Sequence, residues 1–337
     1  MTEREYRGRI APSPTGFLHI GHAMTFWRAQ ERAREAGGKL VLRIEDLDRD
    51  RCRTEFADAI IEDLHWFGLD WNEGPDIGGP FAPYVQSQRR SHYLEAWGKL
   101  RAGGLIYPCK CSRKDVAEAS LAPHDEDDEP IYPGTCRPLH FPVKADVPAA
   151  AAKNEPTCLP MQGGGRILPP VTAEATQSKA PAGRHWRFRV PDGEQIDFVD
   201  GRVGRQSAVA GLDFGDFIIW RRDDVPAYQL AVVMDDAAMR ISDVVRGEDL
   251  LTSTFRQLLL YRALDLTPPK FFHTQLVVDE SGQRLAKRHG SLSLRALRER
   301  GFAGEELRAL HGQIVGKTCS PIGHHPEQRR GIPWKLL

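Results

Sequence analysis

Residues 12–22 of the chain read PSPTGFLHIGH, and this stretch indicates how the fold begins. A short apolar strand around Ile10 precedes it, and its two prolines stiffen the connecting loop. His19 and His22 then project from one side of a helix's first turn, and Gly21 between them lets a ligand approach the backbone. Free N–H groups and the positive end of the helix dipole face outward at such a helix start. We therefore expect the phosphates of a nucleoside triphosphate to bind here.

Size and composition exclude several classes of protein. The 337 residues suffice for one large domain or two ordinary ones, with 41% hydrophobic and 27% charged residues. The formal net charge is zero, which excludes a polybasic, histone-like protein but not a local basic face for nucleic acid. The chain starts with the segment MTERE, whose three charged residues are unlike a secretory signal. No apolar run approaches the ~18 residues that span a bilayer. We expect a cytoplasmic, monomeric enzyme without membrane contact.

Short strands alternate with amphipathic helices over residues 7–135, which predicts an α/β fold with a parallel sheet. The elements expected along the whole chain are strands at 9–11, 39–44, 185–190, 216–220 and 241–245, and helices at 21–35, 54–67, 228–238, 252–263 and 292–316. Thr54 and Thr252 are the expected helix caps. Ligands of such sheets bind at the carboxyl ends of strands, where Glu45 lies.

The whole of residues 12–22 resembles the first signature of class I aminoacyl-tRNA synthetases, in the form found in glutamyl- and glutaminyl-type enzymes. The resemblance implies that His19, Gly21 and His22 bind ATP, which enters with Mg²⁺. The two histidines would stabilise the α-phosphate while an amino-acid carboxylate displaces pyrophosphate. Catalysis of this kind depends on positioning and on neutralising charge on phosphoryl oxygens.

A predicted amino-acid pocket begins at residues 9–13, RIAPS, which resemble the opening of glutamyl-type synthetases. By this resemblance Arg9 meets the substrate's side-chain carboxylate, a natural partner for a planar guanidinium. Ala11 and Ser13 belong to the same pocket, and Glu45 aligns with the acid that holds the α-ammonium. The alternative for Arg9 and Glu45 is a pair of surface charges at strand ends.

Two later stretches extend the resemblance. Residues 226–236, PAYQLAVVMDD, resemble the family's helix with a substrate-contacting tyrosine, here Tyr228. Residues 244–250, VVRGEDL, place Arg246 at a second arginine of the pocket. Two arginines and one acid suit two carboxylates and one ammonium, whereas glutamine would leave one charge unpaired in a desolvated pocket. We therefore expect L-glutamate as the substrate.

The second signature of the class is a lysine loop over the β- and γ-phosphates, and residues 279–288, DESGQRLAKR, occupy its place. Lys287 is the expected catalytic and ATP-binding residue. Arginine stands at Arg284 where the common pattern has its first lysine, and Ala286 replaces a serine. Arg284 is a plausible substitute for the missing charge.

Three cysteines raise the question of a metal. Cys109 and Cys111 form a C-x-C pair, and Cys136 follows Tyr132 by four residues. Three thiolates and one oxygen or nitrogen donor would complete a tetrahedral zinc site. Some members of the resembling family bind structural zinc in an insertion through C-x-C and Y-x3-C, which implies Tyr132 as the fourth ligand. Rival fourth ligands are His124 and Cys158, and the other alternative is a set of reduced cysteines without metal.

The resemblance implies a Rossmann-like class I catalytic domain in four segments. Residues 1–108 are its first half, 109–184 an inserted zinc-type subdomain with cysteines and a flexible Ala/Pro-rich stretch, 185–291 its second half with the lysine loop, and 292–337 a short helical region and tail. The stretch 141–183 has few large apolar residues, so it cannot form much core.

Fewer than fifty residues follow Arg288, too few for an anticodon-binding domain of typical size. Over residues 7–311, apart from the Ala/Pro-rich stretch, the chain is therefore most similar to the glutamyl-Q tRNA(Asp) synthetase family. This implies activation of glutamate with ATP and transfer to queuosine in the anticodon of tRNA(Asp). Two alternatives stay open: a truncated glutamyl-tRNA synthetase that charges a tRNA 3′ end, and a catalytically silent paralogue that binds tRNA or adenylate.

Overall fold

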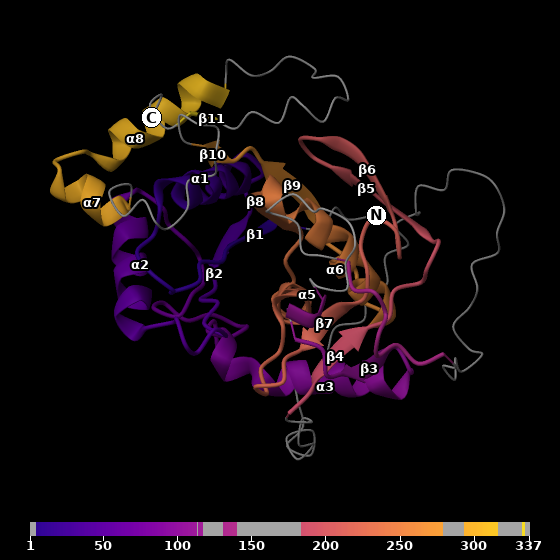
Figure 1. Cartoon of the computed structure of the whole chain (residues 1–337). Coiled ribbons are helices and arrows are strands. Elements are labelled where there is room, and N and C mark those ends of the chain that lie inside the picture. Colours follow the sequence, from indigo (N-terminus) through magenta and orange to yellow (C-terminus); the bar gives the residue numbers. More distant parts are fainter. Residues whose placement is uncertain are drawn as a thin grey trace.

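A computed structural model describes residues 5–112, 114–116, 131–139, 183–278, 293–315 and 332–333 (Figure 1). Several predictions fall outside these residues: the lysine loop with Arg284, Ala286 and Lys287, the Ala/Pro-rich stretch except Gly183, and the rival zinc ligands His124 and Cys158. Within the described part, no helix is both long and apolar enough to cross a membrane.

The helices and strands alternate in the first part of the chain, as predicted. In order they are β1 (Arg7–Ile10), α1 (Ile20–Glu35), β2 (Lys39–Leu42), α2 (Thr54–Trp66), the 3-10 turn η1 (Gln86–Arg89), α3 (Arg90–Ala102), β3 (Ile106–Cys109), β4 (His185–Phe188), β5 (Gln195–Asp200), β6 (Gly204–Val209), β7 (Phe217–Trp220), α5 (Tyr228–Ala238), β8 (Asp243–Gly247), the 3-10 turn η3 (Glu248–Leu250), α6 (Leu251–Ala263), β9 (Lys270–Thr274), β10 (Val277–Val278), α7 (Leu294–Glu299), α8 (Gly304–Val315) and β11 (Ile332–Pro333).

A mainly parallel layer of strands carries the site. β1 pairs in parallel with β2, and β9 pairs in parallel with both β8 and β5, while β6 is added antiparallel to β5. The two groups meet at β1 and β8, where the Ser242 N–H donates to the Arg7 carbonyl over 2.9 Å. The carboxyl ends of β1, β2 and β8 therefore lie at one edge, where a parallel α/β sheet binds its ligands.

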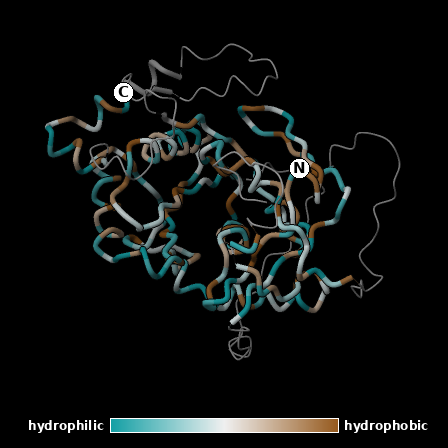
Figure 2. Tube along the Cα trace, viewed as in Figure 1, coloured by the Kyte–Doolittle hydropathy of each residue, from teal (hydrophilic) through white to brown (hydrophobic). Residues whose placement is uncertain are grey.

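Apolar side chains of α1 pack against this layer of strands. Ile20 and Met24 of α1 pack in one buried cluster with Ile10, Leu42 and Val245 from three strands. Figure 2 shows hydrophobic stretches among the inner strands and hydrophilic residues along the outer segments. Burial of these side chains removes apolar surface from water at about 25 cal/mol per Å², so it fixes α1 and its N-terminus against the sheet edge.

A second, antiparallel sheet of order β3-β4-β7 lies beside α3 at the bottom of Figure 1. It is anchored by aromatic packing: the rings of Trp97 on α3 and Trp186 on β4 meet edge to face, with centroids 5.1 Å apart. Cys109, the last residue of β3, is the register partner of His185, the first residue of β4. The chain thus leaves and re-enters this sheet at neighbouring positions.

Both predicted helix caps were wrong. Thr54 is the first residue of α2, and its N-cap, Arg53, makes no side-chain cap hydrogen bond. The Arg53 N–H instead donates to the Pro14 carbonyl over 3.0 Å, so a tertiary contact fixes the helix start. In α6, Thr252 lies inside the first turn, because η3 leads directly into the helix.

The predicted single helical segment 292–316 is two helices. α7 ends at Glu299 and α8 begins at Gly304. Between them Gly301 has φ +88°, a conformation that favours glycine and ends the first helix. Ion pairs of Arg295 and Arg298 with Glu62, at 3.0 and 2.8 Å, hold α7 beside α2 (Figure 1).

Candidate active site

One cavity of about 370 Å³ opens at the carboxyl edge of the parallel layer. The predicted site residues that line it are Arg9, Ala11, Ser13, His19, Gly21, His22, Glu45, Tyr228 and Arg246. These are all the residues predicted to bind ATP or glutamate within the described part of the chain; Lys287 lies outside it. The structure therefore brings together side chains that are far apart in the sequence.

Most of these residues lie at or near the end of a regular element, while Ala11 and Ser13 lie in the loop between β1 and α1. Arg9 comes from β1, Glu45 follows β2, and Arg246 comes from β8. Tyr228 is the first residue of α5, and the histidine motif spans the start of α1. The site is thus built on rigid elements rather than on long loops, which suits a pocket that must hold its charges in fixed positions.

His19 does not lie in the first turn of α1, as the sequence predicted, but caps the helix. Its backbone is extended, and its Nδ1 accepts a hydrogen bond of 3.1 Å from the Gly21 N–H. In a neutral ring this leaves the proton on Nε2, which makes Nε2 a donor. The rings of His19 and His22 stand at 87° with centroids 6.3 Å apart. Two donor-bearing rings at a helix N-terminus suit an anionic ligand.

Two buried arginines face the same cavity from neighbouring strands. Arg9 donates from Nη1 to the Val245 carbonyl over 2.8 Å, and its Nε lies 3.8 Å from an Asp236 oxygen. Arg246 donates to Gln257 and Thr254, over 2.9 and 2.7 Å. Both guanidiniums are only 4% exposed. Such desolvated cations bind a carboxylate more strongly than surface arginines do, because little water screens them.

A network of buried charges lies beneath the cavity, and the sequence reasoning missed it. Arg43, fully buried, donates to Glu45 over 2.9 Å and to Asp236 over 2.7 Å. The adjacent Asp235 lies 3.9 Å from Arg43 and is held by Arg89 at 2.6 Å. Burial raises the pKa of Glu45, and the neighbouring Arg43 opposes this shift. The feature of the sequence that could have indicated this network is the pair of acidic residues in the otherwise mainly apolar helix 228–238.

Both flanks of the segment 279–292 lie at the cavity. On the N-terminal side, Gln275 and Leu276 line it. On the C-terminal side, Ser293 forms an antiparallel bridge with His19, and the Leu294 N–H donates to the Leu18 carbonyl over 2.8 Å. The chain on either side of the predicted lysine loop is therefore anchored beside the histidine motif.

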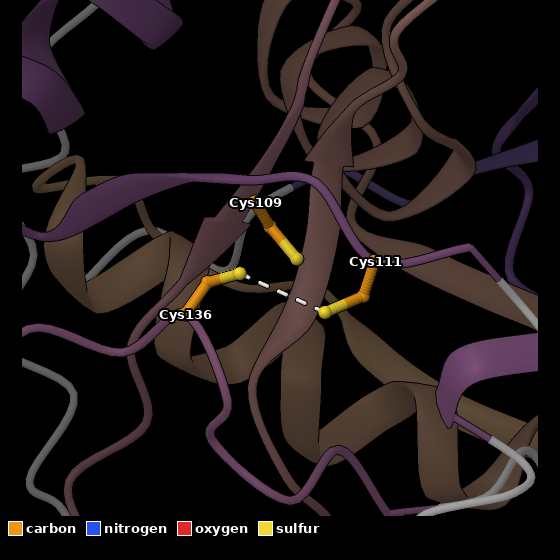
Figure 3. A group of neighbouring side chains, drawn as sticks. All are labelled: Cys109, Cys111 and Cys136. Atoms are coloured by element: carbon orange, nitrogen blue, oxygen red, sulfur yellow. Dashed lines mark hydrogen bonds between the residues drawn. The ribbon is translucent and has the colours of Figure 1, made fainter.

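The three predicted cysteine ligands form a second cluster, at the end of β3. The sulfur atoms of Cys109, Cys111 and Cys136 lie within 4.8 Å of one another and point toward a common centre (Figure 3). The Cys111 and Cys136 sulfurs are 3.6 Å apart, and the Tyr132 hydroxyl lies 3.4 and 3.6 Å from Cys109 and Cys111. Tetrahedral zinc with ordinary bond lengths needs sulfur–sulfur distances of about 3.8 Å and sulfur–oxygen distances of about 3.5 Å. This donor set fits zinc.

The surroundings of the cluster favour the ionised form of Cys136, whereas burial raises the pKa of Cys111 and of Tyr132. Arg187, nearly buried, donates from Nε to the Cys109 sulfur over 3.4 Å, and its guanidinium lies 3.9 Å from the centre of the Tyr132 ring. The Cys136 N–H donates to the Tyr132 hydroxyl over 2.7 Å. Burial raises the pKa of the Cys136 thiol, but hydrogen bonds from the Lys110 backbone and from neighbouring side chains outweigh it and lower the pKa to about 7.

Known proteins resemble this chain over almost its whole length. The family profile described as "tRNA synthetases class I (E and Q), catalytic domain" matches residues 5–162 and 168–313. The Glutamyl-Q tRNA(Asp) synthetase of Nitratidesulfovibrio vulgaris is 45% identical over 97% of this chain and 91% of its own length. The protein of the same name from Symbiobacterium thermophilum is 42% identical over 95% of this chain and 90% of its own length.

A solved structure also matches. The glutamate tRNA ligase of Elizabethkingia meningosepticum, in complex with its amino acid, superimposes with a TM-score of 0.70 at 26% sequence identity. The match covers 92% of this chain but 61% of the ligase. The chain thus spans about three fifths of that longer protein.

The buried network predicts an unequal response to the loss of two arginines. Arg43→Met leaves three buried carboxylates without their shared cation, and we expect it to lower the free energy of unfolding by about 3–5 kcal/mol. Arg262→Met removes an exposed ion pair with Glu194 and should cost about 1 kcal/mol or less. Chemical denaturation at pH 7 measures both. Small, equal losses would contradict the network's role.

Proposed function

Because this chain belongs to the class I tRNA synthetases of the glutamate and glutamine type, we propose that it activates L-glutamate with ATP and Mg²⁺ and transfers the glutamyl group to queuosine in the anticodon of tRNA(Asp). The observation that carries this proposal is the charge pattern of one cavity. The three charges predicted for the amino-acid pocket, Arg9, Arg246 and Glu45, face it together, while Asp249 of the 3-10 turn η3 also lines the cavity. A dicarboxylic amino acid presents the complementary set of two carboxylates and one ammonium.

In the proposed activation step, an oxygen of the glutamate α-carboxylate attacks the α-phosphorus of ATP, and pyrophosphate leaves. Glu45 holds the α-ammonium, Arg9 the side-chain carboxylate, and Tyr228 with Arg246 completes the amino-acid pocket. His19 and His22 donate to oxygens of the α-phosphate at the N-terminus of α1, where charge develops in the transition state. Lys287 neutralises the β- and γ-phosphates. The product is glutamyl-adenylate.

In the proposed transfer step, a hydroxyl on the ring of queuosine attacks the acyl carbon, and AMP leaves while the hydroxyl loses its proton. An acyl-adenylate reacts with any hydroxyl that is placed correctly, so the acceptor depends on what enters the cavity. Bases of a tRNA loop can be splayed out to reach such a pocket. The names of the two relatives, which align over 90% or more of their own length, support this acceptor.

We also propose that Cys109, Cys111, Tyr132 and Cys136 hold a structural zinc ion. The ion would join the end of β3 to the segment around Cys136, away from the cavity. Metal binding at such a site displaces protons from its ligands and stabilises the folded state. The pairing of Cys109 with His185 supports the proposed division of the chain, in which 109–184 is an insertion between the catalytic halves 1–108 and 185–291.

The substrates, ATP, glutamate and a tRNA, support a cytoplasmic place of action, and we propose that the chain acts as a monomer. Among the described residues, those proposed as catalytic or substrate-binding line one cavity of a single copy of the chain, which supports this proposal.

Acylation with labelled glutamate tests the proposed acceptor. We expect label on tRNA(Asp) that contains queuosine and none on the same tRNA without it, because the ring hydroxyl is the nucleophile. The label should survive removal of the 3′-terminal adenosine. Label that disappears with this adenosine would identify a glutamyl-tRNA synthetase instead, and the absence of label on every tRNA would favour a silent paralogue.

Metal analysis tests the zinc site. We expect about one zinc per purified chain and a loss of most of it in Cys111→Ser and Cys136→Ser, because three ligands hold zinc much more weakly than four. Cys52→Ser is the matched control, since Cys52 lies outside the cluster, and it should retain the metal. A wild-type protein that takes up no zinc, or equal zinc content in all variants, would contradict the assignment.

A further inference from the structure

Asp200 and His273 form a buried pair behind the pocket arginine Arg246, and the chemistry above does not use them. Asp200 ends β5 and His273 belongs to β9, and the two side chains are 2% and 0% exposed. The His273 Nδ1 lies 2.7 Å from an Asp200 oxygen. On its other side, the ring contacts Arg246, whose Nε lies 3.1 Å from the His273 Nε2.

The surroundings of Asp200 decide which nitrogen of His273 carries the proton. The Asp200 carboxylate accepts backbone N–H groups of Arg202, Val203 and His273, over 2.9, 3.0 and 3.0 Å. Burial opposes its ionisation, but the hydrogen bonds from His273 and from the backbone outweigh burial and lower the pKa of Asp200. An ionised carboxylate only accepts hydrogen bonds, so the His273 Nδ1 must donate.

A neutral His273 with its proton on Nδ1 presents a lone pair at Nε2. Burial lowers the pKa of His273, which favours this neutral form. Arg246 has donors only, so its Nε–H donates to that lone pair. The other tautomer would set two donors against each other across 3.1 Å. The carboxylate of Asp200 therefore determines, through the imidazole, whether the Arg246 Nε–H has an acceptor at His273.

Three acceptors hold the Arg246 guanidinium along separate edges. His273 takes the Nε–H, Gln257 one Nη1–H, and the Thr254 hydroxyl one Nη2–H. Gln257 is itself fixed by Gln229 of α5, over 2.9 Å. A planar guanidinium recognises a carboxylate through paired, directional hydrogen bonds, so its orientation matters as much as its charge.

We propose that Asp200 and His273 are positioning residues that orient Arg246 toward a carboxylate of the amino-acid substrate and thereby set the affinity for a dicarboxylic amino acid. This inference rests on the proposed function and adds to it two residues that do not touch the substrate. Residues that hold metal-ligating side chains in place typically change affinity or activity about 10- to 100-fold when replaced, and we expect an effect of this order for the residues that hold Arg246.

A matched pair of substitutions separates positioning from simple packing. His273→Gln carries an amide oxygen at the place of Nε2, so it can still accept from Arg246 but loses the bond to Asp200. His273→Asn carries its amide at the place of Nδ1, so it can still donate to Asp200 but leaves the Arg246 Nε without this acceptor. His273→Gln loses the bond to Asp200, whereas His273→Asn loses the Nε2 contacts with Arg246 and with the Thr254 hydroxyl, the latter over 3.2 Å, so we expect both variants to lose thermal stability.

The readout is glutamate-dependent ATP–pyrophosphate exchange by the full chain. We expect His273→Asn to raise the KM for glutamate by about 10-fold or more and to leave the KM for ATP within about 2-fold of the wild-type value. For His273→Gln we expect the KM for glutamate and the KM for ATP both to stay within about 3-fold of the wild-type values. Tyr107→Phe is the control, because it removes a buried hydrogen bond to Asp216 outside the cavity, and it should change neither KM. Equal effects of Gln and Asn on the KM for glutamate would overturn the proposal.

A second measurement needs no variant. With ¹⁵N-labelled histidine, the NMR shifts of His273 should report a protonated Nδ1 and an unprotonated Nε2. A ring protonated on Nε2 would overturn the proposal even if the variants fail to fold. Absence of exchange in the wild type contradicts the proposed function itself, whereas exchange with no selective effect of His273→Asn contradicts only the positioning role.

Discussion

The sharing of one buried cation among three carboxylates is the constraint on which the site depends. Arg43 is fully buried between β2 and α5, where it contacts Glu45 and Asp236 and lies near Asp235. Charges taken out of water this far are stable only with good geometry and with further hydrogen bonds. Asp235 obtains these from Arg89, Tyr93 and Gln86 of α3 and the preceding turn. The network thereby ties three elements together and presents Glu45 to the cavity.

The same arrangement is repeated for the three charged side chains predicted to form the amino-acid pocket. Glu45 is backed by Arg43, Arg9 lies near Asp236, and Arg246 is backed by His273 and Asp200. Because these partners are buried and fixed, the pocket charges need not reorganise when a substrate arrives. The proposed selection of glutamate follows from this arrangement, since each charge of the amino acid would meet a side chain already held in place.

Local patterns predicted several elements well, but they gave no range for α3, β3, β5, β6 or β9. The helix predicted over 228–238 has these bounds in the structure, and α1 begins one residue before its predicted start. The family and the class I fold that residues 12–22 indicate are confirmed by the family profile.

The caps at Thr54 and Thr252 were wrong because a tertiary contact and a preceding turn start those helices. Arg43 meets Asp236 across 193 positions, so the acid pair in helix 228–238 indicates buried charge but not which cation it contacts. The sequence patterns gave no signal for His273, whose strand β9 was not predicted, and the roles of the site residues remain proposals.

The central claim is that the charges of one cavity select and activate glutamate. Pyrophosphate exchange into ATP, measured without any tRNA, tests it most directly by comparing glutamate, glutamine and aspartate. We predict exchange with glutamate and at least about 100-fold weaker exchange with glutamine, because glutamine leaves a buried arginine without its carboxylate. Exchange that is equal for glutamate and glutamine, or absent for both, would contradict the claim.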